Sequence, residues 1–191
     1  DRDHIMTTTL TDEEFRLFRN LIYDESGMFL KDSRKDFLES RLTRRMRAVN
    51  ASSPYWYYRF VTAERKAELL VLLDNLTINE TSFFRNEPQF EFFKKTILPE
   101  LMRQSKRRGD RKLRIWSAGC STGEEPYSIA MAVLESIPNA GCWDIKIHAS
   151  DLSLTALETA HRGVYPAEKT GETVPAELRA KYFTAAEKGY R

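Results

Sequence analysis

The sequence predicts an α/β protein in which an all-helical domain precedes a domain built on a parallel sheet. In the first part, up to about residue 73, apolar residues recur at spacings of three and four, as on one face of a helix. From Leu113 onward, short apolar stretches alternate with helical ones, and a β-α-β-α order predicts parallel strands with right-handed crossovers. We therefore expect domains at residues 7–85 and 86–191.

Four helices are expected in the first domain. Thr11 and Glu14 form a capping box that can start the first helix, and Gly27 can end it. The second is expected at about residues 33–49, the third from Pro54, and the fourth over KAELLVLLDNL. The apolar face of the first helix carries Phe15, Phe18 and Ile22.

The second domain is expected to begin with a polar connection, QSKRRGDRK, that leads into a strand at Leu113–Trp116. A helix then opens at Pro126, and a second strand follows at residues 144–149. Asp151 comes directly after this strand, and another helix follows.

Composition gives little support to several classes of function. The 30 Lys and Arg against 28 Asp and Glu leave a net charge of +2, which gives no support for binding nucleic acid. No apolar run approaches the roughly 20 residues that span a bilayer, so we expect no membrane insertion. Cys120 and Cys142 lack metal-site spacing, which predicts free thiols, no metal and a cytoplasmic location. Asp1–Ile5 is interpreted as a cloning remnant before a start at Met6, so His4 is given no role.

A loop of small residues, 117–123, lies at the end of the first strand and lets a ligand approach the backbone. A phosphate-binding loop would continue with lysine, but Glu124 and Glu125 follow here. Carboxylates repel phosphate and attract an ammonium or sulfonium group, which favours S-adenosylmethionine over ATP or NAD. Asp151 can accept hydrogen bonds from both ribose hydroxyls. The alternative is a helix N-terminus that Glu124 and Glu125 merely stabilise, with Pro126 in its first turn.

The segment NETSFFRNEPQF, residues 79–90, concentrates polar groups where the two domains meet, a common place for ligand sites. A purely structural interpretation makes Thr81 or Ser82 a helix cap and places Phe83 and Phe84 in the core. Asn79, Thr81 and Arg85 are harder to explain in that way.

Four segments carry a family resemblance: LTINETSFFRN, IWSAGCSTGEEPYSIAM, IHASDLSLTALETAHRGVY and AELRAKYF. Together they resemble the CheR family of chemotaxis-receptor protein-glutamate O-methyltransferases, over about residues 15–191. The resemblance implies a helical domain followed by an incomplete Rossmann-like, S-adenosylmethionine-dependent methyltransferase domain. It also implies that Asn79, Thr81 and Arg85 contact the methionine moiety, that Gly119 lies against the cofactor, that Glu125 faces its amino group and that Asp151 holds its ribose.

The implied reaction transfers the sulfonium methyl group to a glutamate on a methyl-accepting chemotaxis receptor and leaves S-adenosylhomocysteine. With a reference pKa of about 4.3, the substrate carboxylate is ionised at pH 7, so no catalytic base is expected and none is assigned. Rate must come from alignment and exclusion of water. His148 and His161 are interpreted as structural or surface residues.

A basic helix face suits the acidic helices of such receptors, which would hold the protein at their cytoplasmic part. Arg34, Arg41, Arg44 and Arg45 share one face of the second helix, next to an apolar stripe of Leu38, Leu42, Met46 and Val49. Alternatively, this face is simply solvated, or the helix binds nucleic acid, against which the net charge argues.

Two strands with their helices make a poor parallel sheet, so we expect the chain to be a fragment of a longer methyltransferase. A second hypothesis is a non-catalytic module that docks an acidic helical partner and keeps a vestigial or regulatory cofactor site.

Overall fold

The computed structural model describes residues 9–63, 66–187 and 189–191; Asp1–Ile5 and Met6 lie outside them. The chain divides into two compact units, one ending at Ile78 and the other spanning Asn79–Arg191. The division thus falls after Ile78 rather than after residue 85. Two long-range hydrogen bonds tie this segment to the second unit: the Asn79 side chain donates to Ser153, and the Phe84 amide donates to Ser128.

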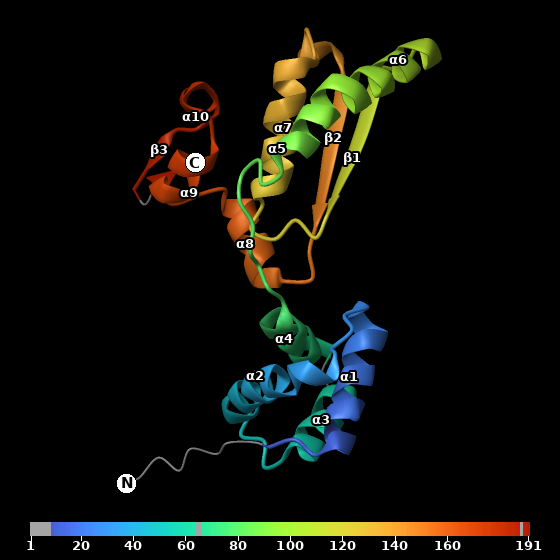
Figure 1. Ribbon diagram of the computed structural model, residues 1–191, viewed down its shortest axis with the longest axis vertical. Coiled ribbons are helices and arrows are strands. Elements are labelled where there is room, and N and C mark those ends of the chain that lie inside the picture. Colours follow the sequence, from blue (N-terminus) through green and yellow to red (C-terminus); the bar gives the residue numbers. More distant parts are fainter. Residues whose placement is uncertain (1–8, 64–65, 188) are drawn as a thin grey trace. The chain divides into compact units, whose positions relative to one another are not determined.

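The four helices expected in the N-terminal unit are all present (Figure 1). The Thr11–Glu14 capping box forms with both of its hydrogen bonds, and Gly27 ends the first helix in the left-handed conformation at φ 74°. The second helix is preceded by one short 3₁₀ turn. The elements are α1 (Asp12–Ser26), η1 (Asp32–Arg34), α2 (Lys35–Ala48), α3 (Pro54–Ala63) and α4 (Lys66–Leu76).

These helices bury one continuous apolar core. It includes Phe15, Phe18 and Ile22 of α1 together with Leu38, Leu42 and Met46 of α2, as their spacing predicts. Val49 is only half-buried against this core. The apolar stripe of α2 therefore faces inward.

The second unit contains two pairs of strands and several helices. One of its helices, α6 (Leu98–Arg108), continues through Arg108 and ends at Gly109, so most of the expected QSKRRGDRK connection is helical. The elements are α5 (Glu87–Phe92), η2 (Phe93–Ile97), α6 (Leu98–Arg108), β1 (Lys112–Ala118), α7 (Glu124–Ser136), η3 (Ala140–Cys142), β2 (Asp144–Ser150), α8 (Leu154–Arg162), α9 (Ala167–Thr173), α10 (Ala176–Tyr182), β3 (Ala185–Ala186) and β4 (Gly189–Tyr190).

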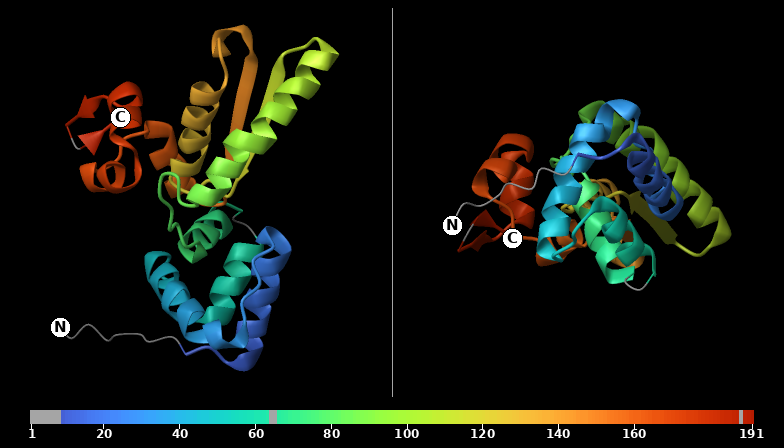
Figure 2. Two further views of the ribbon diagram at one scale, coloured as in Figure 1. Left: turned by 45° about the horizontal axis from the view of Figure 1, so that its top comes forward. Right: turned by 90° about the horizontal axis from the view of Figure 1, so that it is seen from below.

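Strands β1 and β2 are parallel, in register from Lys112 opposite Asp144 to Ala118 opposite Ser150. Figure 2 shows α6 and α7 lying along this pair. Leu113 packs with apolar side chains of both helices in one core. Trp116, which points to the opposite face of the strand, is 70% exposed. The sheet is thus covered on one face, and the carboxyl ends of β1 and β2 lie at the same edge.

Candidate functional site

The 117–123 loop folds back onto the end of β2. The amides of Gly119 and Cys120 both donate to the carbonyl oxygen of Ser150, at 2.8 and 2.9 Å. Gly119 has φ 74°, and no atom lies within 4 Å of the position a Cβ would take there. The backbone at Gly119 therefore borders open space, as close approach of a ligand requires.

Asp151 joins the end of β2 to this loop. Its Oδ2 accepts a hydrogen bond from the Ser121 amide at 2.7 Å, and its Oδ1 accepts one from the Ser153 amide at 2.8 Å. Each carboxylate oxygen can accept a further hydrogen bond, so the group can still receive ribose hydroxyls. Asp151 consequently shapes the loop as well as offering acceptors to a ligand.

The two glutamates after the loop differ in environment. Glu125 is exposed, and its Oε1 accepts from the Ser117 hydroxyl at 2.6 Å. Glu124 is fully buried and pairs with Lys169 at 2.7 Å. The expectation that both carboxylates face a ligand is therefore wrong for Glu124, because its charge is neutralised inside the protein.

The pKa of the Cys120 thiol indicates the sign of the electrostatic potential at the loop. Burial raises the pKa of its thiol, and the charges of Asp151 and Glu125 raise it further. Both carboxylates therefore act on the same few atoms of the loop. A negative potential of this kind disfavours phosphate and favours a cationic ligand group.

The segment from Asn79 to Arg85 lies partly at this site. Asn79 Nδ2 donates to the hydroxyl of Ser153 at 3.2 Å, and Ser153 follows Asp151 by two residues. Thr81 is half-buried, whereas Arg85 donates to the Glu80 carbonyl and lines a separate cavity of about 780 Å³ with α5 and residues 171–178. The structure thus brings Asn79 to Ser153, two residues beyond Asp151, while Arg85 bonds to Glu80 and lines the other cavity.

The helix cap proposed by the structural interpretation of this segment is wrong in position. Asn86 caps α5 by accepting a hydrogen bond from the Gln89 amide, so neither Thr81 nor Ser82 serves as the cap. Phe83 is buried, as that interpretation expects, and Phe84 is partly buried.

Ser121 is a site residue that the sequence did not single out. Its Oγ is buried without a hydrogen-bond partner, and its φ of 49° is left-handed. An unsatisfied hydroxyl is costly, and it lies two residues from the open space at Gly119. Together with that space and the carboxylates of Glu125 and Asp151, it makes the loop fit a polar, cationic cofactor.

Three of the four arginines expected on one face of the second helix remain available: Arg41 and Arg44 lie on α2, whereas Arg34 lies in η1, just before α2. Arg34 and Arg44 are exposed, and Arg41 is half-buried with its guanidinium 5.0 Å from the Phe37 ring centroid. Arg45 is different, because its guanidinium forms two hydrogen bonds to Glu68 at 2.9 and 2.8 Å. The assignment of Arg45 to partner binding is therefore corrected: its charge is already paired inside the helical unit.

The histidines and cysteines of the described residues were the remaining candidates for a chemical site. His148 and His161 are both exposed, and Cys120 and Cys142 are free. Among residues 9–63, 66–187 and 189–191, no cluster of His, Cys, Asp or Glu could hold a metal ion. None of the helices described in those ranges is long and apolar enough to cross a membrane.

The fold and site define an α/β domain that binds a nucleoside-bearing, cationic cofactor at the carboxyl ends of parallel strands. Residues 79–191 match "CheR methyltransferase, SAM binding domain", and residues 13–77 match "CheR methyltransferase, all-alpha domain". The chain therefore belongs to the CheR methyltransferase family, and its second domain is the part that binds S-adenosylmethionine. The two matched regions meet where the structure divides, at Ile78.

Curated relatives agree with this assignment. The chain is 38% identical to chemotaxis protein methyltransferase 2 of Pseudomonas aeruginosa, over 91% of this chain and 59% of the relative. Identity to chemotaxis protein methyltransferase 2 of Vibrio cholerae is 34%, over 92% of this chain and 60% of the relative. Identity to the chemotaxis protein methyltransferase of Escherichia coli is 35%, over 91% of this chain and 57% of the relative. The chain spans about three fifths of the length of these relatives.

Proposed function

We propose that this chain is the cofactor-binding and receptor-docking part of a protein-glutamate O-methyltransferase. The enzyme would convert glutamate side chains on chemoreceptor helices into methyl esters. One observation carries the proposal: the carboxylates of Glu125 and Asp151 flank a loop with open space at Gly119, in a chain of the CheR family. The family assignment does not favour a non-catalytic docking module.

The proposed roles follow from charge and position. Bound S-adenosylmethionine supplies an activated methyl group on a sulfonium centre. Asp151 would accept hydrogen bonds from the ribose hydroxyls, and Glu125 would face the cationic amino group. Gly119 would lie against the cofactor by its backbone. Asn79, Thr81 and Arg85 would contact the methionine moiety; Arg85 donates to the Glu80 carbonyl through one nitrogen and keeps other N–H donors for a ligand.

The receptor would dock on the basic surface of η1 and α2. Arg34, Arg41 and Arg44 present cationic groups, and acidic receptor helices present the opposite charge. The substrate glutamate is ionised at neutral pH, so the protein needs to orient its carboxylate and exclude water rather than remove a proton. This would place the enzyme at the cytoplasmic part of its receptor.

Calorimetric titration with S-adenosylhomocysteine tests the cofactor site. We expect saturable binding near one equivalent. Glu125→Gln should weaken binding about tenfold, because a charge-assisted contact is lost. Glu158→Gln removes a carboxylate from the exposed surface of α8 and serves as the matched control. Equal affinities for the wild type and Glu125→Gln would refute the proposed role of Glu125.

Asp151→Ala is a less specific variant than Glu125→Gln. Because Asp151 also holds the amides of Ser121 and Ser153, its removal disturbs the loop itself. Loss of binding in Asp151→Ala alone would therefore not separate ribose recognition from loop geometry.

Transfer to a receptor is tested with S-adenosylmethionine carrying a tritiated methyl group and a receptor cytoplasmic fragment. The proposal expects label that is released by alkali, as a methyl ester is, and that disappears when the acceptor glutamates are changed to glutamine. Label that resists alkali would overturn the assignment of glutamate as the acceptor.

A further inference from the structure

We propose that Tyr165 and Lys169 are positioning residues that hold the C-terminal half of the 117–123 loop in its cofactor-binding conformation. The proposal rests on the proposed function, since it concerns the same loop. Both residues lie beyond α8. Tyr165 contacts Thr122 of the loop, and Lys169 contacts Glu124 directly after it, each more than 40 positions back along the chain.

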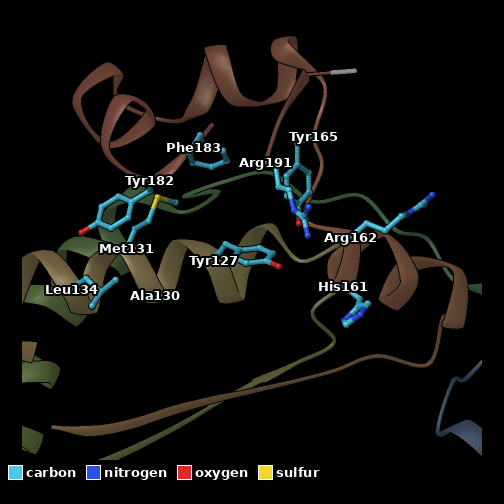
Figure 3. Close-up of a pocket in the computed structure, with 11 residues that line it drawn as sticks. Tyr127, Ala130, Met131, Leu134, His161, Arg162, Tyr165, Tyr182, Phe183 and Arg191 are labelled. Carbon is cyan, nitrogen blue, oxygen red and sulfur yellow. The ribbon is translucent and has the colours of Figure 1, made fainter. Parts of the chain in front are cut away.

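Tyr165 holds the loop through its hydroxyl. This group donates to the carbonyl oxygen of Thr122 at 2.7 Å. The side chain is buried, and its ring packs edge-on against Phe83 with centroids 4.9 Å apart. Burial raises the pKa of Tyr165, so the hydroxyl remains a donor throughout the physiological range. Figure 3 shows Tyr165 with Tyr127 among the residues that line a cavity of about 330 Å³.

The backbone of Tyr165 is itself anchored. Its amide donates to the carbonyl of Tyr190 at 2.8 Å, and the amide of Tyr190 donates back at 2.9 Å. Strand β4 therefore fixes the backbone of Tyr165. The position of the Tyr165 hydroxyl, which binds the Thr122 carbonyl of the loop, is fixed as a result.

The backbone of the loop at Gly123 lies in close contact with Ala160 of α8 and with Tyr165. A Cβ at Gly123 would lie 2.7 Å from the Cβ of Ala160 and 2.8 Å from the hydroxyl oxygen of Tyr165. Any side chain would displace Tyr165 or α8. Glycine here permits the close contact, whereas Gly119 opens onto free space.

Lys169 holds the loop through charge. Its Nζ lies 2.7 Å from Oε1 of Glu124, the first residue after the loop, and Glu124 is fully buried. The hydroxyl of Thr122 donates to the other carboxylate oxygen at 2.6 Å. A buried carboxylate is stable only when paired, so Lys169 is what allows Glu124 to point inward.

The loop is thus held from two sides. Ser150 and Asp151 bind the amides of residues 119–121, and Tyr165 and Lys169 bind groups of residues 122–124. Loss of the second set would let the whole turn relax, including the backbone at Gly119. Cofactor affinity would then fall, although neither Tyr165 nor Lys169 has to touch the cofactor.

Tyr165→Phe tests the hydroxyl, and Tyr127→Phe is its matched control. Tyr127 also donates to a backbone carbonyl, that of Ala160 on α8, at 2.9 Å. We expect Tyr165→Phe to speed hydrogen exchange of the amides of residues 119–123 and to weaken S-adenosylhomocysteine binding, each about five- to tenfold. Tyr127→Phe should change neither.

Lys169→Met tests the role of the positive charge at position 169, because it removes the ion pair with Glu124. Lys169→Arg keeps a positive charge there and should preserve the ion pair. Lys181→Met is the control, because Lys181 pairs with Glu135 on the exposed part of α7, at 2.6 Å. We expect faster exchange of residues 119–123 only in Lys169→Met, with exchange near the wild-type rate in Lys169→Arg.

The exchange measurement keeps the two proposals separate. If the wild type does not bind S-adenosylhomocysteine, the proposed function fails for this chain, but exchange in the unliganded protein still decides whether Tyr165 and Lys169 hold the loop. If Tyr165→Phe and Lys169→Met match their controls in exchange, the positioning role is overturned even when the wild type binds.

Discussion

Replacing Arg45 with methionine should destabilise the helical unit without removing a docking group. The guanidinium makes two hydrogen bonds to Glu68, and the hydroxyl of Tyr57 donates to the same carboxylate at 2.7 Å. The side chains of Arg45 and Glu68 are 19% and 9% exposed. Methionine keeps the apolar stem of Arg45 but leaves Glu68 buried without its cation.

The magnitude follows from burial. Breaking one side of a buried ion pair costs about 3–5 kcal/mol. Residual exposure lets water reach Glu68, and Tyr57 still donates to it, so we expect about 2–3 kcal/mol here. For a unit of this size, 1 kcal/mol lowers the midpoint of thermal unfolding by about 4–8 °C, so a loss of about 2–3 kcal/mol gives a fall of about 8–24 °C.

The assay compares Arg45→Met with Arg44→Met, its exposed neighbour, by circular dichroism melts and by hydrogen exchange of α2–α4. Arg44→Met should unfold like the wild type and bind the receptor fragment more weakly. Arg45→Met should unfold earlier. An unchanged midpoint for Arg45→Met, together with weakened receptor binding, would refute the reasoning and return Arg45 to the docking face.

Three further predictions concern single positions. Gly119→Ala should cost about 1 kcal/mol, for a positive φ in open space, yet abolish most S-adenosylhomocysteine binding in calorimetry because its methyl group fills that space. Gly123→Ala should cost about 3 kcal/mol or more in urea unfolding, because its Cβ would collide with Ala160; a loss below about 1 kcal/mol would contradict the packing. The Ser105 hydroxyl holds the pKa of Asp110 down to about 2, so this carboxylate stabilises the fold above about pH 4 and the contribution is lost as pH falls through about 2. Carboxyl titration by NMR should place the Asp110 midpoint near 2 in the wild type and higher in Ser105→Ala, where the Lys112 amide and Arg108 still hold it below its usual value.

Local sequence signals predicted the secondary structure well. The capping box at Thr11 and Glu14 and the stop at Gly27 are confirmed, because both depend on residues only a few positions apart. The parallel pairing of β1 and β2 is confirmed for a related reason, since the helix between them leaves few alternatives. The prediction of a non-helical connection at residues 104–112 was wrong for its first half, because its Lys and Arg residues also suit the last turn of a helix.

The candidate site was predicted only in outline. Residue types and spacing placed Gly119, Glu125 and Asp151 near one strand edge. Residue type and spacing could not distinguish Glu124 from Glu125, which are adjacent and chemically identical; only the family resemblance pointed to Glu125. Lys169 decides between them, and it lies 45 residues further along the chain. Nor did spacing reveal Ser121, whose unpaired hydroxyl is visible only once the loop is folded.

The sequence by itself determined the order of helices and strands, the family and the set of groups available to a cofactor. These depend on short-range periodicity, capping and motif identity. Only the tertiary structure decided which charges remain available to a ligand or partner. Arg45 forms an ion pair with Glu68, and Glu124 forms one with Lys169. Arg44 and Glu125, by contrast, are exposed. The physical reason is that a buried charge must find its partner, and that partner can come from any part of the folded chain.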